Sequence, residues 1–533
     1  MVNAQQWLES QPEYNTKEKR EKVIELDISG LWGKLDLSEF INLEKLNLWG
    51  NLLTEIIFPA NPINIKELYL GGCNRLTGSL DFLSNMKNLK VLEIIDNDFD
   101  EVNLDKLPRS LEDISYSALR PDCKLTKIIP ELDKVKYGFC QKCQKFNTSR
   151  KWCQTCAEKE WKQDLKNLPE QEVVEKLIQN LGKDAYGNYR LQQIDYERFT
   201  DIEYIAEGGY GIIYKAKWKE SEQQLRHNPY NDIVLKSLHK YKNVSVEFLT
   251  ELTNNILVND YNTSPYTVKC WGISQNPTTK NYIMVMDHIK GGNLREYLQQ
   301  NSKKLNLGIK LDKLYNIAMG LSVINDQNLI HRDLHPGNIL NDKYDDGDGD
   351  GFDRSFITDL GLCRLVNYQK ENSKTYVYGV LPYIDPEVLQ GKPYTQASDI
   401  YSFGIIAYEL LTNAFPYIDY NLNDTQLELA ICQGLRPNID ELPILQLLKD
   451  LIKSCWDADP TKRPSARELY KVLGDWWIEV YNKKDTPFYQ QYQEIEAKYN
   501  YFSKNTAYKI HPKTIVTSRP IDTKQITEKK QAK

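Results

Sequence analysis

The sequence has little net charge and no long apolar run. Its 533 residues carry 68 Lys and Arg against 74 Asp and Glu, a net charge of −6, which favours neither nucleic acid nor a membrane surface as a partner. The longest apolar stretch, SFGIIAYELL at 402–411, is far too short to cross a bilayer. The first residues also lack the apolar core of a signal peptide, so we expect a cytoplasmic protein.

Cysteine is scarce and unevenly placed. The chain has ten cysteines, and a cytoplasmic protein keeps them mostly reduced, so a cluster indicates metal ligands before disulfides. Four thiolates in two CxxC pairs fit one tetrahedral Zn²⁺ and leave no position for water, which predicts a small structural zinc module over 137–160. A redox pair or unligated cysteines are the alternatives. The four ligands expected are Cys140, Cys143, Cys153 and Cys156.

The chain is too long for one hydrophobic core, and its first part repeats itself. Apolar residues recur every 20 to 24 positions, and one unit reads L-x-x-L-x-L-x-x-N and ends at Asn51. This resembles a leucine-rich repeat over 20–130, which implies a solenoid that binds a protein partner or serves as a brace. Its asparagines are expected to satisfy backbone groups at turns. An ordinary α/β domain with coincidental leucines is the alternative. The recurring residues are Leu26, Leu46, Leu68, Leu92 and Ile114.

Residues 161–198 are expected to form a helical linker. The run PEQEVVEKLIQNLGK places Pro169 at a first helical turn and Gly182 at a stop. Its apolar residues fall on one face, which predicts an amphipathic helix packed against a neighbour.

A glycine-rich turn between two β-type runs, IAEGGYGIIYKAKW, follows Phe199. Glycine lets backbone N–H groups approach phosphate oxygens, although Ala206 replaces the first glycine of the usual G-x-G-x-x-G. Farther along, DIVLK ends in Lys236, and the expected helix VEFLTELTNNILV carries Glu251, with Glu247 as the second choice of partner. The residues expected around the nucleotide in this turn are Ala206, Glu207, Gly208, Gly209, Tyr210, Gly211 and Ile213.

The next motifs come in the order and at the approximate spacing of one fold. They are IMVMDHIKGGNLREYL, HRDLHPGN, ITDLGLCR, GVLPYIDPEVL, SDIYSFGIIAYEL and DPTKRPSARELY. Together they resemble a protein kinase over 199–477, which implies a bilobal α+β fold that binds ATP and Mg²⁺ and acts on a protein substrate. The whole chain is therefore expected to be multidomain: a leucine-rich-repeat solenoid, a zinc module and a kinase.

The resemblance also implies roles for single residues. Lys236, held by Glu251, orients the α- and β-phosphates, and Asp333 accepts the proton of the substrate hydroxyl. Asn338 and Asp359 supply oxygen ligands to Mg²⁺. The remaining roles are the gatekeeper Met286, the hinge residues Asp287, His288 and Ile289 that meet adenine, the ion pair Glu387–Arg463, and Asp399 as anchor of the catalytic loop.

Longer phrases point to one branch of this fold. YGFCQKC…WCQTC, YERFTDIEYIAEGGYGIIYKAKW, GVLPYIDPEVLQGKPYTQASDIYSFGII and IHPKTIVTSRPIDTKQIT resemble the kinase family expanded in arbuscular mycorrhizal fungi, whose catalytic domains are similar to tyrosine-kinase-like serine/threonine kinases. Three residues depart from the common kinase pattern. His335 replaces the lysine that contacts the γ-phosphate, Val380 a threonine and Asp385 an alanine, so a nucleotide-binding scaffold is the alternative to an active enzyme.

Three further segments also carry expectations. DDGDGDGFD at 345–353 fits half of an EF-hand loop, but Ile357 takes the place of the required glutamate, which favours a solvated loop. Ser373 and Thr375 are candidate phosphorylation sites, with Arg332 as their partner. The tail, 478–533, is expected to hold some helix at 486–499 and otherwise to be mobile and without chemistry.

Overall fold

The computed structural model describes most of the chain and divides it into two compact units, 1–160 and 161–533. Each unit is described by itself. The described residues are 2–72, 76–117, 123–133, 135–147, 152–181, 191–208, 211–219, 232–237, 245–258, 266–344, 352–365, 376–420, 422–483, 486–510 and 514–522.

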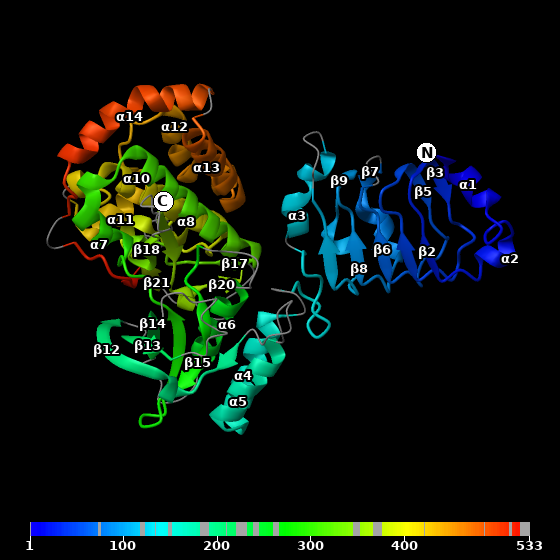
Figure 1. The fold of residues 1–533 in the computed structure, drawn as a ribbon, viewed down its shortest axis with the longest axis horizontal. Coiled ribbons are helices and arrows are strands. Elements are labelled where there is room, and N and C mark those ends of the chain that lie inside the picture. The colour runs from blue at the N-terminus through cyan, green and yellow to red at the C-terminus, as the bar shows by residue number, and fades with distance from the viewer. Residues whose placement is uncertain are drawn as a thin grey trace, which may run out of the picture. The chain divides into compact units, whose positions relative to one another are not determined.

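The first unit contains a solenoid-like region built on a parallel sheet (Figure 1). Leu26, Leu46, Leu68, Leu92 and Ile114 stand side by side in its register, and each is at most 3% exposed. The repeat period therefore becomes a continuous row of apolar side chains inside the unit. The strands are β2 (Glu25–Asp27), β4 (Lys45–Asn47), β6 (Glu67–Tyr69), β8 (Val91–Glu93) and β10 (Asp113–Ser115).

Two sheets with fewer strands, also parallel, accompany this one. They join β1 (Val2–Asn3), β3 (Leu31–Asp36) and β5 (Leu52–Ile57), and separately β7 (Thr77–Ser79) and β9 (Asp98–Glu101). The core begins before residue 20, because α1 (Ala4–Ser10) buries Ala4 and Leu8 against it. The other helices are α2 (Lys17–Arg20) and α3 (Ile129–Asp133).

Asparagine side chains satisfy backbone groups inside the turns of the solenoid. Asn51 Nδ2 donates to the carbonyls of Ile28 at 2.8 Å and Leu48 at 2.7 Å, and its Oδ1 accepts from Leu31 N–H at 2.9 Å. Asn97 Nδ2 donates to Leu70 O at 2.8 Å in a later turn. Buried backbone groups that would otherwise lack partners are thereby paired, as the repeat pattern predicts.

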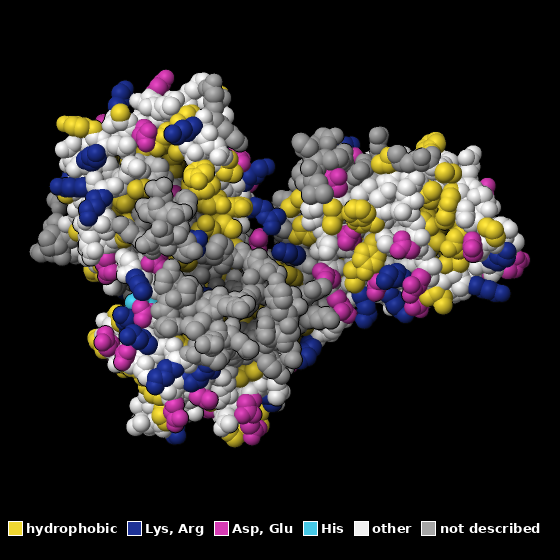
Figure 2. All heavy atoms as spheres, in the orientation of Figure 1, with side chains coloured by type: hydrophobic (Ala, Val, Ile, Leu, Met, Phe, Trp, Pro, Cys, Tyr) yellow, Lys and Arg dark blue, Asp and Glu magenta, His cyan; other side chains and the backbone are white. Residues whose placement is uncertain are grey.

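Charged side chains of both signs lie beside one another on the solenoid face drawn in Figure 2. Within the solenoid, charged side chains pair between neighbouring turns, for example Lys66 with Glu44 at 2.7 Å and Lys45 with Glu67 at 3.1 Å. Such exposed pairs contribute little to stability. They do keep the local charge balanced, in keeping with the small net charge of the chain.

Two helices precede the six-stranded sheet of the second unit. α4 (Gln154–Asn167) begins between the last two clustered cysteines, and α5 (Glu170–Leu181) follows it directly. The buried residues of α5 are Val173, Val174, Leu177 and Leu181, so one face of the helix is packed. Gly182, the expected stop, lies outside the described residues.

The smaller lobe of the second unit is a six-stranded sheet in the order β11-β15-β16-β14-β13-β12. All its pairings are antiparallel except that of β11 with β15. The elements are β11 (Gln192–Gln193), β12 (Phe199–Gly208), β13 (Gly211–Trp218), β14 (Asp232–Ser237), α6 (Val246–Val258), β15 (Cys270–Gln275) and β16 (Tyr282–Asp287).

The larger lobe is mainly helical and holds the main core of this unit. Its helices are α7 (Leu294–Asn301), α8 (Leu307–Asp326), α9 (Pro386–Leu389), α10 (Gln396–Thr412), α11 (Asp424–Cys432), α12 (Gln446–Cys455), α13 (Ala466–Tyr481) and α14 (Pro487–Asn505). Three short antiparallel pairs join them: β17 (Leu329–Ile330) with β20 (Arg364–Leu365), β18 (Ile339–Tyr344) with β19 (Phe352–Ile357), and β21 (Tyr376–Gly379) with β22 (Arg519–Asp522).

Strands β18 and β19 flank the acidic insert, where an EF-hand would need helices. Its residues Asp346, Asp348, Asp350 and Gly351 lie outside the described part of the chain, as do Ser373 and Thr375. Across the residues that the structure does describe, we find no helix both long enough and apolar enough to cross a bilayer.

The C-terminal segment corrects our expectation of a mobile tail. In Figure 1, α14 lies across the larger lobe and the red segment after it runs along the lobe to β21. Tyr499 is fully buried and its hydroxyl donates to Leu411 O at 2.7 Å, while the Tyr508 hydroxyl bonds to the buried Glu409. Residues 486–510 and 514–522 are therefore part of the lobe.

Candidate active site

Lys236 is held between two carboxylates. Strand β14 places its Nζ 2.5 Å from Glu251 Oε1 on α6 and 3.1 Å from Asp359 Oδ1. Burial alone would lower the pKa of Lys236, but Asp359 and Glu251 together raise it above its ordinary value, so the ammonium stays charged. Glu247, the second candidate for this pair, is exposed, and the structure selects Glu251.

Helix α10 anchors the loop that carries the HRD motif, residues 331–333. The Asp399 carboxylate accepts the backbone N–H groups of His331 at 2.7 Å and Arg332 at 3.0 Å. Arg332 has φ +70°, a left-handed conformation that costs energy and needs such support. The loop then presents Asp333, which is 6% exposed and whose pKa burial raises to about 7.

Two oxygen-bearing side chains lie beside this aspartate. Asn338 Nδ2 donates to Asp333 O at 2.9 Å and to Asp333 Oδ2 at 3.3 Å, so the side-chain oxygen of Asn338 is available to a cation. Asp359 has φ +63° and uses Oδ1 to accept from Lys236. After it, Leu360 is buried and its carbonyl accepts from Asn254 on α6.

His335 is buried and uncharged. Burial, with Arg295 and His331 nearby, lowers its pKa to about 3. Its Nδ1 accepts the Gly337 backbone N–H at 3.0 Å, so in the neutral ring the hydrogen must sit on Nε2. Nε2 lies 3.0 Å from the hydroxyl of Ser518, a residue of the C-terminal segment.

The other nucleotide-binding candidates occupy the small lobe and the connection between the lobes. Asp287 ends β16, where its backbone N–H donates to Lys269 O at 3.0 Å and its Oδ1 accepts from Trp271 Nε1 at 2.7 Å. Ile289 follows and is half-buried. In the β12–β13 hairpin, Ala206 pairs with Ile213, Glu207 with Ile212 and Gly208 with Gly211. Gly209 and Tyr210 lie outside the described residues.

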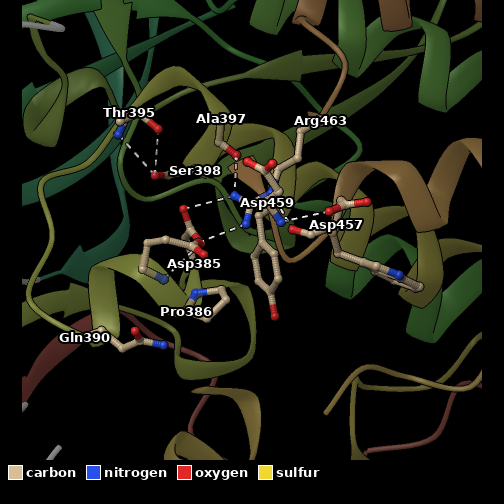
Figure 3. A network of polar contacts seen from close by, with 12 residues as sticks. Asp385, Pro386, Gln390, Thr395, Ala397, Ser398, Asp457, Asp459 and Arg463 are labelled. Atoms are coloured by element: carbon tan, nitrogen blue, oxygen red, sulfur yellow. Dashed lines mark hydrogen bonds and ion pairs between the residues drawn. The ribbon is translucent and has the colours of Figure 1, made fainter. Parts of the chain in front are cut away.

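A buried ion pair braces the larger lobe (Figure 3). Arg463 Nη2 lies 2.9 Å from Glu387 Oε2, and Nη1 lies 3.1 Å from Asp385 Oδ2. Arg463 also donates to the carbonyls of Ala397 and Asp457, each at 3.0 Å. Asp385, the residue that departs from the kinase pattern, thus joins this network and also caps α9 through the N–H of Glu387.

With this geometry in view, residues 199–473 match the family model described as "Protein tyrosine and serine/threonine kinase". The match covers more than half of the 533 residues, and the chain belongs to this family. Its members transfer the γ-phosphate of ATP to protein hydroxyl groups.

Similar proteins also carry protein-kinase names. A Dictyostelium discoideum protein named "Probable serine/threonine-protein kinase" is 29% identical over 310 residues, 56% of this chain and 31% of the relative. Mitogen-activated protein kinase kinase kinase 10 of Xenopus laevis is 28% identical over 284 residues, 51% of this chain and 26% of the relative. An Arabidopsis thaliana protein kinase and PP2C-like domain-containing protein is 32% identical over 234 residues, 38% and 34% of the two. The chain thus spans about a third or less of these relatives.

The sequence motifs assign no role to two residues of the site. Ser518 contacts Asp333, and the buried Arg295 donates through Nη1 to Val516 O at 3.1 Å. A run of β-branched residues, IVT at 515–517, is the one sequence signal for an extended segment in the tail. The run lies just before β22 (Arg519–Asp522), and nothing in the sequence names β21 as the partner of that strand.

Proposed function

We propose that this chain is an ATP- and Mg²⁺-dependent protein kinase that phosphorylates serine or threonine. The observation that carries the proposal is the three-charge contact of Lys236 with Glu251 and Asp359, beside a loop that holds Asp333 and Asn338 together. A kinase needs both the lysine–glutamate pair and the metal-binding aspartate in place at once. The serine/threonine preference is supported by the names of the relatives.

Each side chain would contribute one task. Lys236 would hold the α- and β-phosphates, and the backbone at Asp287 and Ile289 would bind adenine. Asp333 is buried and contacts the hydroxyl of Ser518. It would take the proton from the hydroxyl that accepts the phosphate.

The oxygens of Asn338 and Asp359 fit Mg²⁺, a hard ion that prefers carboxylate and amide oxygen. When bound, Mg²⁺ would neutralise charge on the phosphates. The neutral His335 would stand where most kinases carry a lysine, as a hydrogen-bond donor without charge.

The experiment compares the purified full chain with Asp333→Ala, using Mg-ATP and myelin basic protein as acceptor. We expect transfer by the wild type and a loss on the order of 10²- to 10⁴-fold in the variant. If both proteins bind ATP and neither transfers phosphate, the chain is a nucleotide-binding scaffold instead.

The cysteine cluster is proposed as a structural zinc site. The four Sγ atoms lie within 4.8 Å of one another, with Cys140–Cys156 at 3.7 Å and Cys143–Cys153 at 3.6 Å. A tetrahedral ion with Zn–S bonds of about 2.3 Å needs sulfurs about 3.8 Å apart, so the cluster fits Zn²⁺. Burial raises the pKa of Cys156 to about 11 in the metal-free cluster, a penalty that a cation would offset.

The solenoid is proposed as a leucine-rich repeat that binds a protein partner. The buried asparagine contacts support the repeat type, and the exposed Trp32 and Trp49, 49% and 56% exposed, are side chains suited to an interface.

Membership of the fungal kinase expansion is supported by the phrases that span the cysteine cluster, the kinase and the tail. A cytoplasmic location is supported by the cysteines: the nine in the described residues form no disulfide bond, as a reducing compartment would keep them.

A further inference from the structure

The C-terminal segment places a serine on the candidate catalytic base. Ser518 Oγ lies 2.7 Å from Asp333 Oδ1 and 2.6 Å from Oδ2. His335 Nε2, which carries the ring hydrogen, donates to Ser518 Oγ at 3.0 Å. The hydroxyl hydrogen of Ser518 is thereby directed to the Asp333 carboxylate, which is the arrangement that a phosphoacceptor needs.

The backbone on the C-terminal side of Ser518 is held as a strand. β22 pairs antiparallel with β21, so that Arg519 lies opposite Gly379 and Ile521 opposite Val377. Extended peptides bind by this kind of strand addition: main-chain bonds give affinity, and alternate side chains enter pockets. On the other side of Ser518, the buried Arg295 holds Val516 O.

Two side chains after Ser518 fix its register. Ile521 is 9% exposed and packs in an apolar cluster with residues of the 381–389 segment and α11. Arg519 forms an ion pair with Asp424 at the start of α11. A slip of one residue would turn Ile521 out of its pocket and take Ser518 off Asp333, so the segment specifies Ser518 and not its neighbour Thr517.

We propose that residues 514–522 are an intramolecular substrate of this kinase and that Ser518 is its phosphoacceptor. The proposal rests on the proposed function and defines its preferred acceptor: a serine followed, three positions later, by an aliphatic residue. Ser518 Oγ attacks the γ-phosphorus of ATP, the bond from that phosphorus to the β,γ-bridging oxygen breaks, and Asp333 takes the hydroxyl proton. The products are phosphoserine 518 and ADP.

The docked segment occupies the place of any other substrate until this transfer is complete. The phosphate then sets about two negative charges beside the buried Asp333, and like-charge repulsion releases the segment. Phosphorylation of external proteins is thus expected to show a lag that ends as Ser518 becomes modified.

The test incubates the full chain with Mg-ATP and follows Ser518 by mass spectrometry. We expect phosphate on Ser518 at a fractional rate that stays constant over a hundredfold dilution, as a reaction within one chain requires. Thr517→Ala is the matched control, because Thr517 is the exposed neighbouring hydroxyl, and it should leave the site and rate unchanged. Ser518→Ala should abolish that phosphopeptide.

A second variant and an external substrate separate this proposal from the one on which it rests. Ile521→Asp removes a buried aliphatic side chain from the docked segment, so modification of Ser518 should slow. The synthetic peptide TIVTSRPID keeps its isoleucine and competes with a segment that now binds less tightly, so its kcat/KM should rise about tenfold. Transfer to myelin basic protein without any phosphate on Ser518 would overturn the intramolecular substrate and leave the kinase standing. No transfer to either would overturn the kinase.

Discussion

Asp385 Oδ2 accepts a hydrogen bond from Arg463 Nη1 at 3.1 Å, and both side chains are almost fully buried. The residue that departs from the usual alanine of kinases therefore gives the buried arginine a second carboxylate beside Glu387. Burial would raise the pKa of Asp385, but hydrogen bonds and the positive charge of Arg463 hold it below its ordinary value. In the folded lobe this departure strengthens a brace, and it gives no reason to expect an inactive enzyme.

Removing Arg463 and removing Asp385 should lower the free energy of unfolding by different amounts. Arg463→Ala leaves two buried carboxylates without their cation and should lower the free energy of unfolding of the kinase unit by about 3–5 kcal/mol. Asp385→Ala keeps the Glu387 pair and loses one bond and a helix cap, about 1–2 kcal/mol. Urea unfolding of the full chain, read from its tryptophans, measures both. Asp440→Ala, in an exposed pair with Lys453, is the control and should change little.

His335 should affect the orientation of the acceptor hydroxyl more than the stability of the fold. His335→Phe removes the Nε2 donor to Ser518 and should lower kcat for the peptide TIVTSRPID on the order of 10²-fold, with KM little changed. Loss of the Gly337 contact should cost about 1 kcal/mol of stability, visible as a small shift in melting temperature. An unchanged kcat would mean that Asp333 alone orients the hydroxyl.

Lys310 should make stability depend on pH. It is fully buried on α8, donates to Asn413 Oδ1 at 2.7 Å, and has a pKa that burial lowers from 10.5 to about 7. Between these values the unfolded chain binds a proton that the folded chain has released, so stability rises with pH from about 7 upward. Lys310→Met removes this dependence, and its stability relative to the wild type should be higher at pH 7.5 than at pH 9.5 by on the order of 2 kcal/mol.

Thermal unfolding at the two pH values measures this difference, and the pH-independent loss of the Asn413 contact cancels from it. Lys303→Met, at an exposed position near the start of α8, should give curves parallel to the wild type. Parallel curves for Lys310→Met as well would show that the amine is charged in the folded chain.

The residues proposed for the chemical tasks lie in short motifs, and sequence could therefore single them out. Lys236, Asp333 and Asp359 each sit in a short motif whose chemistry allows few substitutes, and the structure brings them together. The solenoid register was also readable, because a buried row such as Leu46 and Leu68 must repeat at one period along the chain.

Long-range contacts of ordinary residues were not readable. Ser518 lies 185 positions from Asp333, and a four-residue strand carries too little pattern to name its partner. Lys310 would be expected at the surface from its charge, but α8 is packed on nearly every side, and Lys310 and Lys313 are both buried. Asp385 looked like a defect because its partner Arg463, 78 positions away, is visible only in three dimensions.

The four thiols should bind one Zn²⁺ per chain and need it for their fold. In the full chain, Cys140→Ser and Cys153→Ser remove one ligand from each close sulfur pair, Cys140–Cys156 and Cys143–Cys153, and elemental analysis should show loss of the ion in both. Each should also lower the melting temperature of the first unit, because the free energy of Zn²⁺ binding no longer stabilises the folded state. Cys123→Ser, a buried cysteine outside the cluster, is the control: it should cost stability and keep the zinc. Full zinc in both cluster variants would mean that the metal binds elsewhere.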